Sequence, residues 1–135
     1  MHASALQDAI RSIVTRDSRF DPDAYLFLKE ALDFTLKRAK EENEDSPRHV
    51  SGKELLIGFR DHSLEQFGPI AFTVLREWGV HTCTHVGEMV FHLINEQIFG
   101  KQDSDTLEDF AEIFTFHDAF IAPFLPEHNP TLPAA

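Results

Sequence analysis

Apolar side chains that recur every three or four residues constrain this chain more than any other feature of its sequence. The clearest run begins after Asp21 and forms one helical stripe, at Tyr25, Leu28, Leu32, Leu36 and Ala39. Asp21 suits the N-cap position and Pro22 the first helical position. Similar spacing predicts five more helices, beginning near residues 3, 51, 68, 84 and 105. Strand signals are poor, so the sequence predicts a mainly α, compact single-domain bundle of about six helices.

Two stretches in the second half depart from this helical pattern. Residues 114–116 alternate apolar and polar side chains as a strand does, so a small winged-helix-like β-hairpin between about 98 and 116 is an alternative there. Four of the last 13 residues are proline, which disfavours helix and favours extended backbone. We therefore expect one helical domain over 1–122 and a proline-rich extended tail over 123–135.

The charge of the chain is acidic and unevenly distributed. The 135 residues carry a formal net charge of −11, and residues 61–135 hold 12 acidic but only two basic side chains. Nucleic acid is therefore disfavoured as a partner, because its binding depends on Lys and Arg that neutralise phosphates. Solubility is the simpler explanation of the acidic half. The alternative is a surface that meets a basic partner protein.

The sequence also limits where the protein works. No apolar run reaches the roughly 18 residues that a membrane span needs, so no membrane partner is expected. The first ten residues lack the basic and apolar regions of a signal peptide. The single cysteine rules out an intrachain disulfide framework. Together these features predict a cytoplasmic protein.

The chemically richest segment is His81-Thr-Cys83-Thr-His85. Imidazole and thiolate groups bind zinc or another transition metal, and alternate residues in extended backbone point the same way. Glu88 and His92 follow on the helical face of His85, so all five side chains are candidate metal ligands. A linker whose threonines cap a helix, with Cys83 buried as a small side chain, explains the same pattern. A metal-binding protein or enzyme using this cluster is thus an alternative function.

Other functional motifs are weak. The sequence has no nucleophile elbow, phosphate-binding glycine loop or paired-histidine zinc motif, so catalysis is disfavoured. A helix ending at Trp78-Gly79-Val80, a short turn and a helix starting near His85 resemble a helix-turn-helix. The second of these helices has neither Lys nor Arg, which disfavours a DNA-binding regulator.

Phenylalanine is unusually frequent, with 13 residues against one Trp and one Tyr. Phe120 and Phe124 lie near the chain end beside prolines. They either close the core or form an apolar patch for a partner protein or for self-association, and the two explanations are evenly balanced. Both are therefore candidate protein-binding residues. The main functional prediction is a non-enzymatic protein–protein interaction or adaptor module.

Two resemblances emerge from particular segments. The broader one covers most of the chain and rests on Arg16–Tyr25 with Asp33–Thr35, Arg48–Leu56, Glu65–Pro69, Trp78–Val80, Gly87–Phe91, and Asp109-Phe110 with Asp118–Phe120. These segments resemble a small uncharacterised protein family known mainly from planctomycetes and verrucomicrobia. That resemblance implies no function and no site.

The second resemblance covers about residues 24–80. It rests on Ala31–Ala39, His49-Val50, Glu54-Leu55-Leu56 and Val74–Val80. In order, these segments are similar to one repeat of the N-terminal domain of Clp-type protein-remodelling ATPases. In that repeat a histidine usually follows the glutamate, whereas here Leu55 follows Glu54. The resemblance implies an all-helical fold and a protein-docking role.

Overall fold

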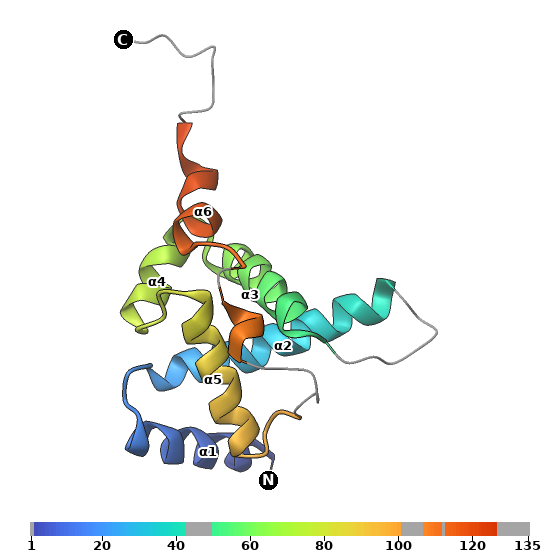
Figure 1. Ribbon diagram of the computed structural model, residues 1–135, viewed down its shortest axis with the longest axis vertical. Coiled ribbons are helices and arrows are strands. Elements are labelled where there is room, and N and C mark those ends of the chain that lie inside the picture. Colours follow the sequence, from blue (N-terminus) through green and yellow to red (C-terminus); the bar gives the residue numbers. More distant parts are fainter. Residues whose placement is uncertain (1, 43–49, 101–106, 112, 127–135) are drawn as a thin grey trace.

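The computed structural model describes residues 2–42, 50–100, 107–111 and 113–126 (Figure 1). Its α-helices and shorter 3-10 turns, labelled η, are α1 (His2–Arg16), α2 (Pro22–Glu42), α3 (Gly52–Phe67), η1 (Gly68–Ile70), α4 (Ala71–Glu77), α5 (Cys83–Asn95), η2 (Leu107–Phe110), α6 (Phe116–Phe120) and η3 (Ala122–Phe124). The described residues contain no strand. The prediction of a mainly α fold is confirmed. Within these ranges, no helix combines the length and the apolar character needed to cross a membrane.

The segment between about 98 and 116, for which a hairpin is the alternative to helix, contains the turn η2 in its described part. Residues 101–106 and 112 of that segment lie outside the described residues, and the hairpin is not confirmed. The helix predicted to begin near residue 105 is replaced by η2 and the short helix α6. Thr115 begins α6, because its hydroxyl accepts a hydrogen bond from the backbone N–H of Asp118. Most of the expected tail, 127–135, is likewise outside the described residues, and Pro123 lies within η3.

The helices pack in an order that differs from a simple up-and-down bundle. α2 and α3 form the most extensive pair, and α5 packs against α3, η2 and α1. α1 lies at one end of the molecule, across α5, whereas α6 and η3 project at the opposite end beside α4 (Figure 1). The long helix α2 packs against α3 and α1, whereas α3 contacts α2, α4, α5 and α6.

The core is continuous and dominated by aliphatic and aromatic side chains. Its largest fully buried members include Tyr25, Leu28, Leu56, Phe59, Leu75, Met89 and Leu93. Burial of each such side chain stabilises the fold by about 1.5–3 kcal/mol relative to an exposed position. These residues come from α2, α3, α4 and α5, so one core unites the four helices.

Gly79 fixes the junction between α4 and the loop after α1. Its φ is 86°, in the left-handed region that favours glycine, and a Cβ there would overlap the carbonyl oxygen of Arg19. The backbone N–H of Asp21 donates to the carbonyl of Trp78 at 3.0 Å, which joins the same two segments. This junction holds residues 19–21 against the end of α4.

Replacement of Gly79 tests that junction. We expect Gly79→Ala to destabilise the protein by about 2 kcal/mol, because the new side chain is strained in its backbone conformation and collides with Arg19. Gly100→Ala is the control, since a Cβ there meets no atom of the described residues within 4 Å, and should change stability by less than about 0.5 kcal/mol. Urea denaturation followed by circular dichroism measures both. Equal stability of the two variants would contradict the assignment.

Candidate functional site

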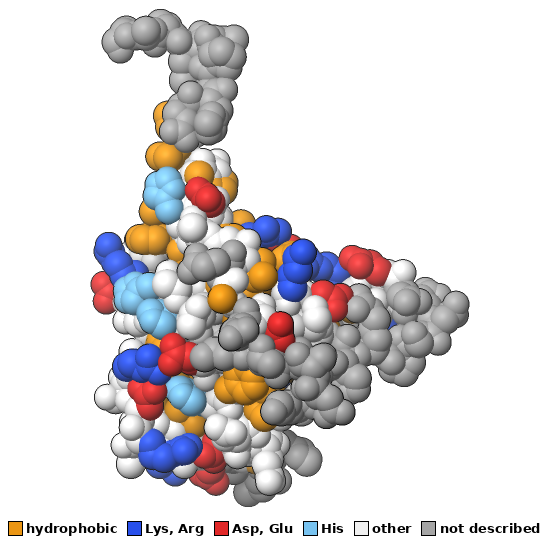
Figure 2. Space-filling model, viewed as in Figure 1, with side chains coloured by type: hydrophobic (Ala, Val, Ile, Leu, Met, Phe, Trp, Pro, Cys, Tyr) orange, Lys and Arg blue, Asp and Glu red, His pale blue; other side chains and the backbone are white. Residues whose placement is uncertain are grey.

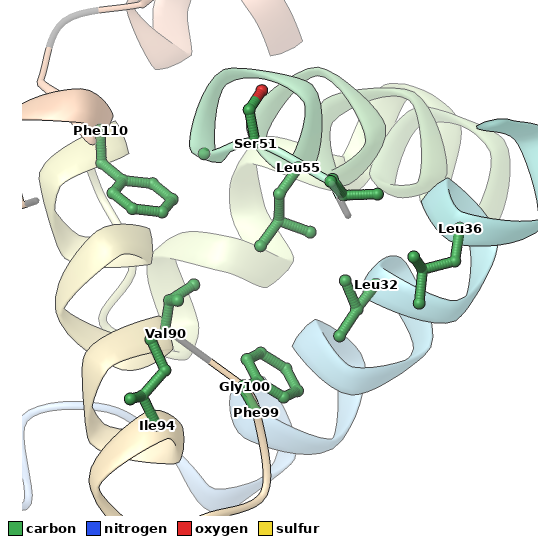
Figure 3. A pocket seen from close by; sticks show the side chains of 11 residues that line it. Leu32, Leu36, Ser51, Leu55, Val90, Ile94, Phe99, Gly100 and Phe110 are labelled. Atoms are coloured by element: carbon green, nitrogen blue, oxygen red, sulfur yellow. The ribbon is translucent and has the colours of Figure 1, made fainter. Parts of the chain in front are cut away.

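The main candidate binding site is an apolar pocket between α2, α3, α5 and η2 (Figure 3). Its volume is about 250 Å³. The side chains of Leu32, Leu55, Val90, Ile94, Phe99 and Phe110 surround it. They come from segments far apart in the sequence, so the pocket exists only in the folded chain.

The pocket has a buried floor and an exposed rim. Leu55, Val90, Phe99 and Phe110 are buried, whereas Leu36 on the rim is 38% exposed. Ser51 and Gly100 are also exposed at this rim. A cleft of this kind can hold an apolar group without rearrangement of the core.

Two glycines explain the position of Phe110 in the floor. A Cβ on Gly52 would lie 3.0 Å from the Phe110 ring, and a Cβ on Gly87 would lie 2.6 Å from the Cβ of Phe110. Phe110 thus packs directly on the backbones of α3 and α5. Larger side chains at either glycine would displace it from the pocket.

The polar groups at the pocket edge are satisfied within the chain. The Ser51 hydroxyl accepts from the backbone N–H of Glu54 at 3.1 Å, and the Glu54 carboxylate accepts from the Ser51 N–H at 3.0 Å. This capping box begins α3. The Ser51 hydroxyl points away from the cavity (Figure 3), so the interior of the pocket is chemically apolar.

The histidine and cysteine side chains proposed as metal ligands have other partners. The backbone N–H of His81 donates to Nδ1 of His85 at 3.1 Å, and the two ring centroids are 5.7 Å apart. Cys83 is buried, and its thiol donates to the carbonyl of Phe114 at 3.2 Å. Thr82 caps α5, because its hydroxyl accepts from the His85 N–H. This arrangement matches the capping linker that the sequence offers as the alternative to a metal site.

Glu88 and His92 also contact residues outside the proposed cluster. Arg19 bridges two carboxylates, at 2.6 Å from Glu88 and 2.9 Å from Asp17. The Tyr25 hydroxyl is hydrogen-bonded to Nδ1 of His92 at 2.9 Å, and Nε2 of His92 lies 3.6 Å from Asp17. Among the described residues, no three His, Cys, Asp or Glu side chains lie where they could hold a metal ion.

These five side chains form a polar network that sequence reasoning missed, comprising Asp17, Arg19, Tyr25, Glu88 and His92. Figure 2 shows acidic, basic and histidine side chains along its left edge, where the loop after α1 meets α5 in Figure 1. The network attaches this loop to α5. The sequence signal for part of it is the helical spacing of Glu88 and His92, which places both on one face of α5.

Burial and ionic contacts shift the pKa values of groups in the polar network and that of the nearby His85. The hydrogen bond from Arg19 lowers the pKa of Asp17 to about 2. Burial lowers the pKa of His92 and that of His85 and raises the pKa of the Tyr25 hydroxyl. The nearby Asp17 carboxylate favours a proton on Nε2 of His92, so that Nδ1 accepts from Tyr25.

Phe120 and Phe124, the two candidate protein-binding residues, have different environments. Phe120 is 1% exposed and packs with its ring centroid 5.0 Å from that of Phe116, so it is a core residue rather than a contact surface. Phe124 is 46% exposed on η3. Leu125, the next residue, is 40% exposed. We call Phe124 and Leu125 the C-terminal apolar surface.

A second apolar groove lies between α1 and α2. Ile10, Val14, Pro22 and Leu26 contribute to it, and its volume is about 370 Å³. Most of its lining residues are exposed, and Leu26 is 40% exposed. It is therefore a shallower feature than the pocket of Figure 3.

Comparison with known proteins adds no constraint to these sites. No family model, curated protein or solved structure matches this chain.

The polar network makes stability depend on pH. The pKa of His92 and that of His85 are lowered in the folded protein, so the unfolded chain binds more protons below its histidine pKa of about 6.5. Stability should therefore be full above that pH and decrease as the pH falls below it. A second decrease should follow below about pH 3.8, as Asp17 becomes protonated. Urea denaturation midpoints from pH 8 to pH 3 measure both.

A matched pair of variants isolates the histidine contribution. His92→Gln keeps an acceptor for Tyr25 but cannot titrate, so its stability should change less between pH 7 and pH 5 than that of the parent protein. His117→Gln is the control, because His117 is exposed on α6. An unchanged pH dependence in His92→Gln would contradict the assignment.

Proposed function

We infer that this chain is a non-enzymatic, cytoplasmic protein-interaction module that binds its partner through the C-terminal apolar surface. The observation that supports this function best is the exposure of Phe124 on a short ordered turn. Large aromatic side chains carry much of the binding energy of protein interfaces when a partner buries them. Leu125 would extend the apolar contact beside Phe124.

The backbone around Phe124 supports its role as an anchor. Pro123 restricts φ in the turn η3, and the backbone N–H of Phe124 donates to the carbonyl of Ile121 at 3.0 Å. A side chain presented by an ordered turn loses less conformational entropy on binding than one on a free chain. This favours Phe124 as the first contact of a partner.

Charge and resemblance point to the class of partner. Residues 61–135, which include this surface, are strongly acidic, which suits a basic partner protein. The similarity of residues 24–80 to a repeat of the Clp N-terminal domain supports a docking role. Self-association through the same apolar surface is the other form of this proposal.

The two alternative functions have weaker support. Cys83, His85, Glu88 and His92 already have protein partners, which weakens a metal site or an enzyme built on them. α5, the helix that would read DNA in a helix-turn-helix, contains no Lys or Arg. Both features favour an interaction module over a metalloprotein or a regulator.

A pull-down with paired variants tests the proposed surface. Tagged protein incubated with lysate of its source cells should retain a partner at near one-to-one recovery, or should form a dimer by light scattering. Phe124→Asp should reduce that recovery or dimerisation by at least about tenfold, because it places a charge in an apolar contact. Mass spectrometry of the retained protein identifies the partner.

Leu26→Asp is the matched control, because Leu26 is as exposed as Phe124 but lies on the groove between α1 and α2. It should leave recovery or dimerisation unchanged. A monomer with no retained partner, or a partner lost in Leu26→Asp but kept in Phe124→Asp, would refute the proposed surface.

A further inference from the structure

We propose that the pocket of Figure 3 is a binding site for a small, uncharged organic molecule with an apolar body. The pocket is distinct from the C-terminal apolar surface: its lining comes from α2, α3 and the two residues before it, α5, Phe99, Gly100 and Phe110. Ligand binding there is therefore a further function, independent of the proposed protein partner.

The size of the pocket sets the size of the ligand. A cavity of 150 Å³ lined by aliphatic and aromatic side chains is large enough to bind benzene, and one water-sized group occupies about 30 Å³. The pocket of about 250 Å³ therefore suits a bicyclic aromatic ring or an alkyl chain of roughly eight carbons. Larger ligands would extend past Leu36 into solvent.

The lining determines that the bound part of the ligand is apolar. The side chains that surround the cavity in Figure 3 are aliphatic or aromatic, and the buried residues Leu55, Val90 and Phe110 form its floor. The Ser51 hydroxyl points away from the cavity. A polar group placed in the interior would lose its hydrogen bonds to water without replacement.

The rim argues against an anionic ligand. α3 begins at this rim, and the positive end of a helix would ordinarily attract a carboxylate. Here the carboxylate of Glu54 already accepts the Ser51 N–H within the capping box. A ligand carboxylate would therefore find the Ser51 N–H already hydrogen-bonded.

The groove between α1 and α2 is a less suitable site for such a ligand, although its volume is larger. It is formed by two helices only, and the exposed Gln7, Arg11 and Thr15 are part of its lining. A small molecule there would remain in contact with water. The pocket of Figure 3, with walls from α2, α3, α5 and η2, removes more of the ligand's apolar area from water, which is the driving force for binding.

Titration of the full chain with 1-octanol tests the proposal, and octanoate is the matched anionic probe with the same chain length. In amide NMR spectra, 1-octanol should shift resonances around Leu32, Leu55 and Val90, and it should raise the melting temperature. Octanoate should bind more weakly because of Glu54. Shifts confined to the residues around Leu26, or no saturable shift with 1-octanol, would overturn the proposal. Equal affinity for octanoate would overturn the assignment of an uncharged ligand.

Two variants locate the site. Leu36→Glu places a carboxylate at the exposed rim and should weaken 1-octanol binding at least about tenfold. Leu26→Glu, on the same helix and equally exposed, should have no effect. Leu32→Trp should fill the half-buried wall and abolish binding, with circular dichroism confirming that both pocket variants fold. Unchanged affinity in Leu36→Glu and Leu32→Trp would overturn the proposal, whatever the partner experiment shows for Phe124.

Discussion

The close packing of α2 on α3 is the constraint on which the rest of the structure depends. Gly58 permits it, because a Cβ at that position would overlap the hydroxyl of Thr35 on α2. Thr35 is buried, and its hydroxyl donates to the carbonyl of Ala31 at 2.7 Å. The hydroxyl therefore keeps a hydrogen-bond partner despite the close approach of the two helices. α1 then packs against α2, and α4, α5 and α6 pack against α3. The pocket of Figure 3 opens beside this helix pair, so its shape follows from the distance between them.

α5 connects two chemically different parts of the molecule. Val90 and Ile94 line the apolar pocket, while Glu88 and His92 join the polar network with the loop after α1. A single helix can do both because residues three or four apart lie on one face and intervening residues lie on another. The polar network fixes this loop, and the loop in turn contacts Gly79 at the end of α4. The position of α5 is therefore determined by apolar packing on one face and by hydrogen bonds and ion pairs on the other.

The candidate sites show which features of a site can be predicted from residues that are close in sequence. The helical spacing of His85, Glu88 and His92 predicts their common face, and the structure places Glu88 and His92 together in one network. The helical spacing did not predict that Asp17, Arg19 and Tyr25 would contact Glu88 and His92, since those residues are more than 60 positions away in the chain. The apolar pocket was missed for the same reason, because its walls come from four separate segments. Phe120 and Phe124 had equivalent sequence contexts, and only packing against Phe116 made Phe120 a core residue.

The sequence by itself determined the mainly α composition and the starts of its best-defined helices. Apolar spacing and helix-start residues such as Asp21 and Pro22 act within a few neighbouring positions, so they can be interpreted without knowledge of the fold. Only the tertiary structure decided which of two similar phenylalanines is exposed, which partners the histidines have, and where an apolar pocket opens. Each of these depends on side chains distant in sequence that meet when α2, α3 and α5 pack together. Local patterning fixes which residues are helical, whereas the geometry of helix packing fixes which of them meet.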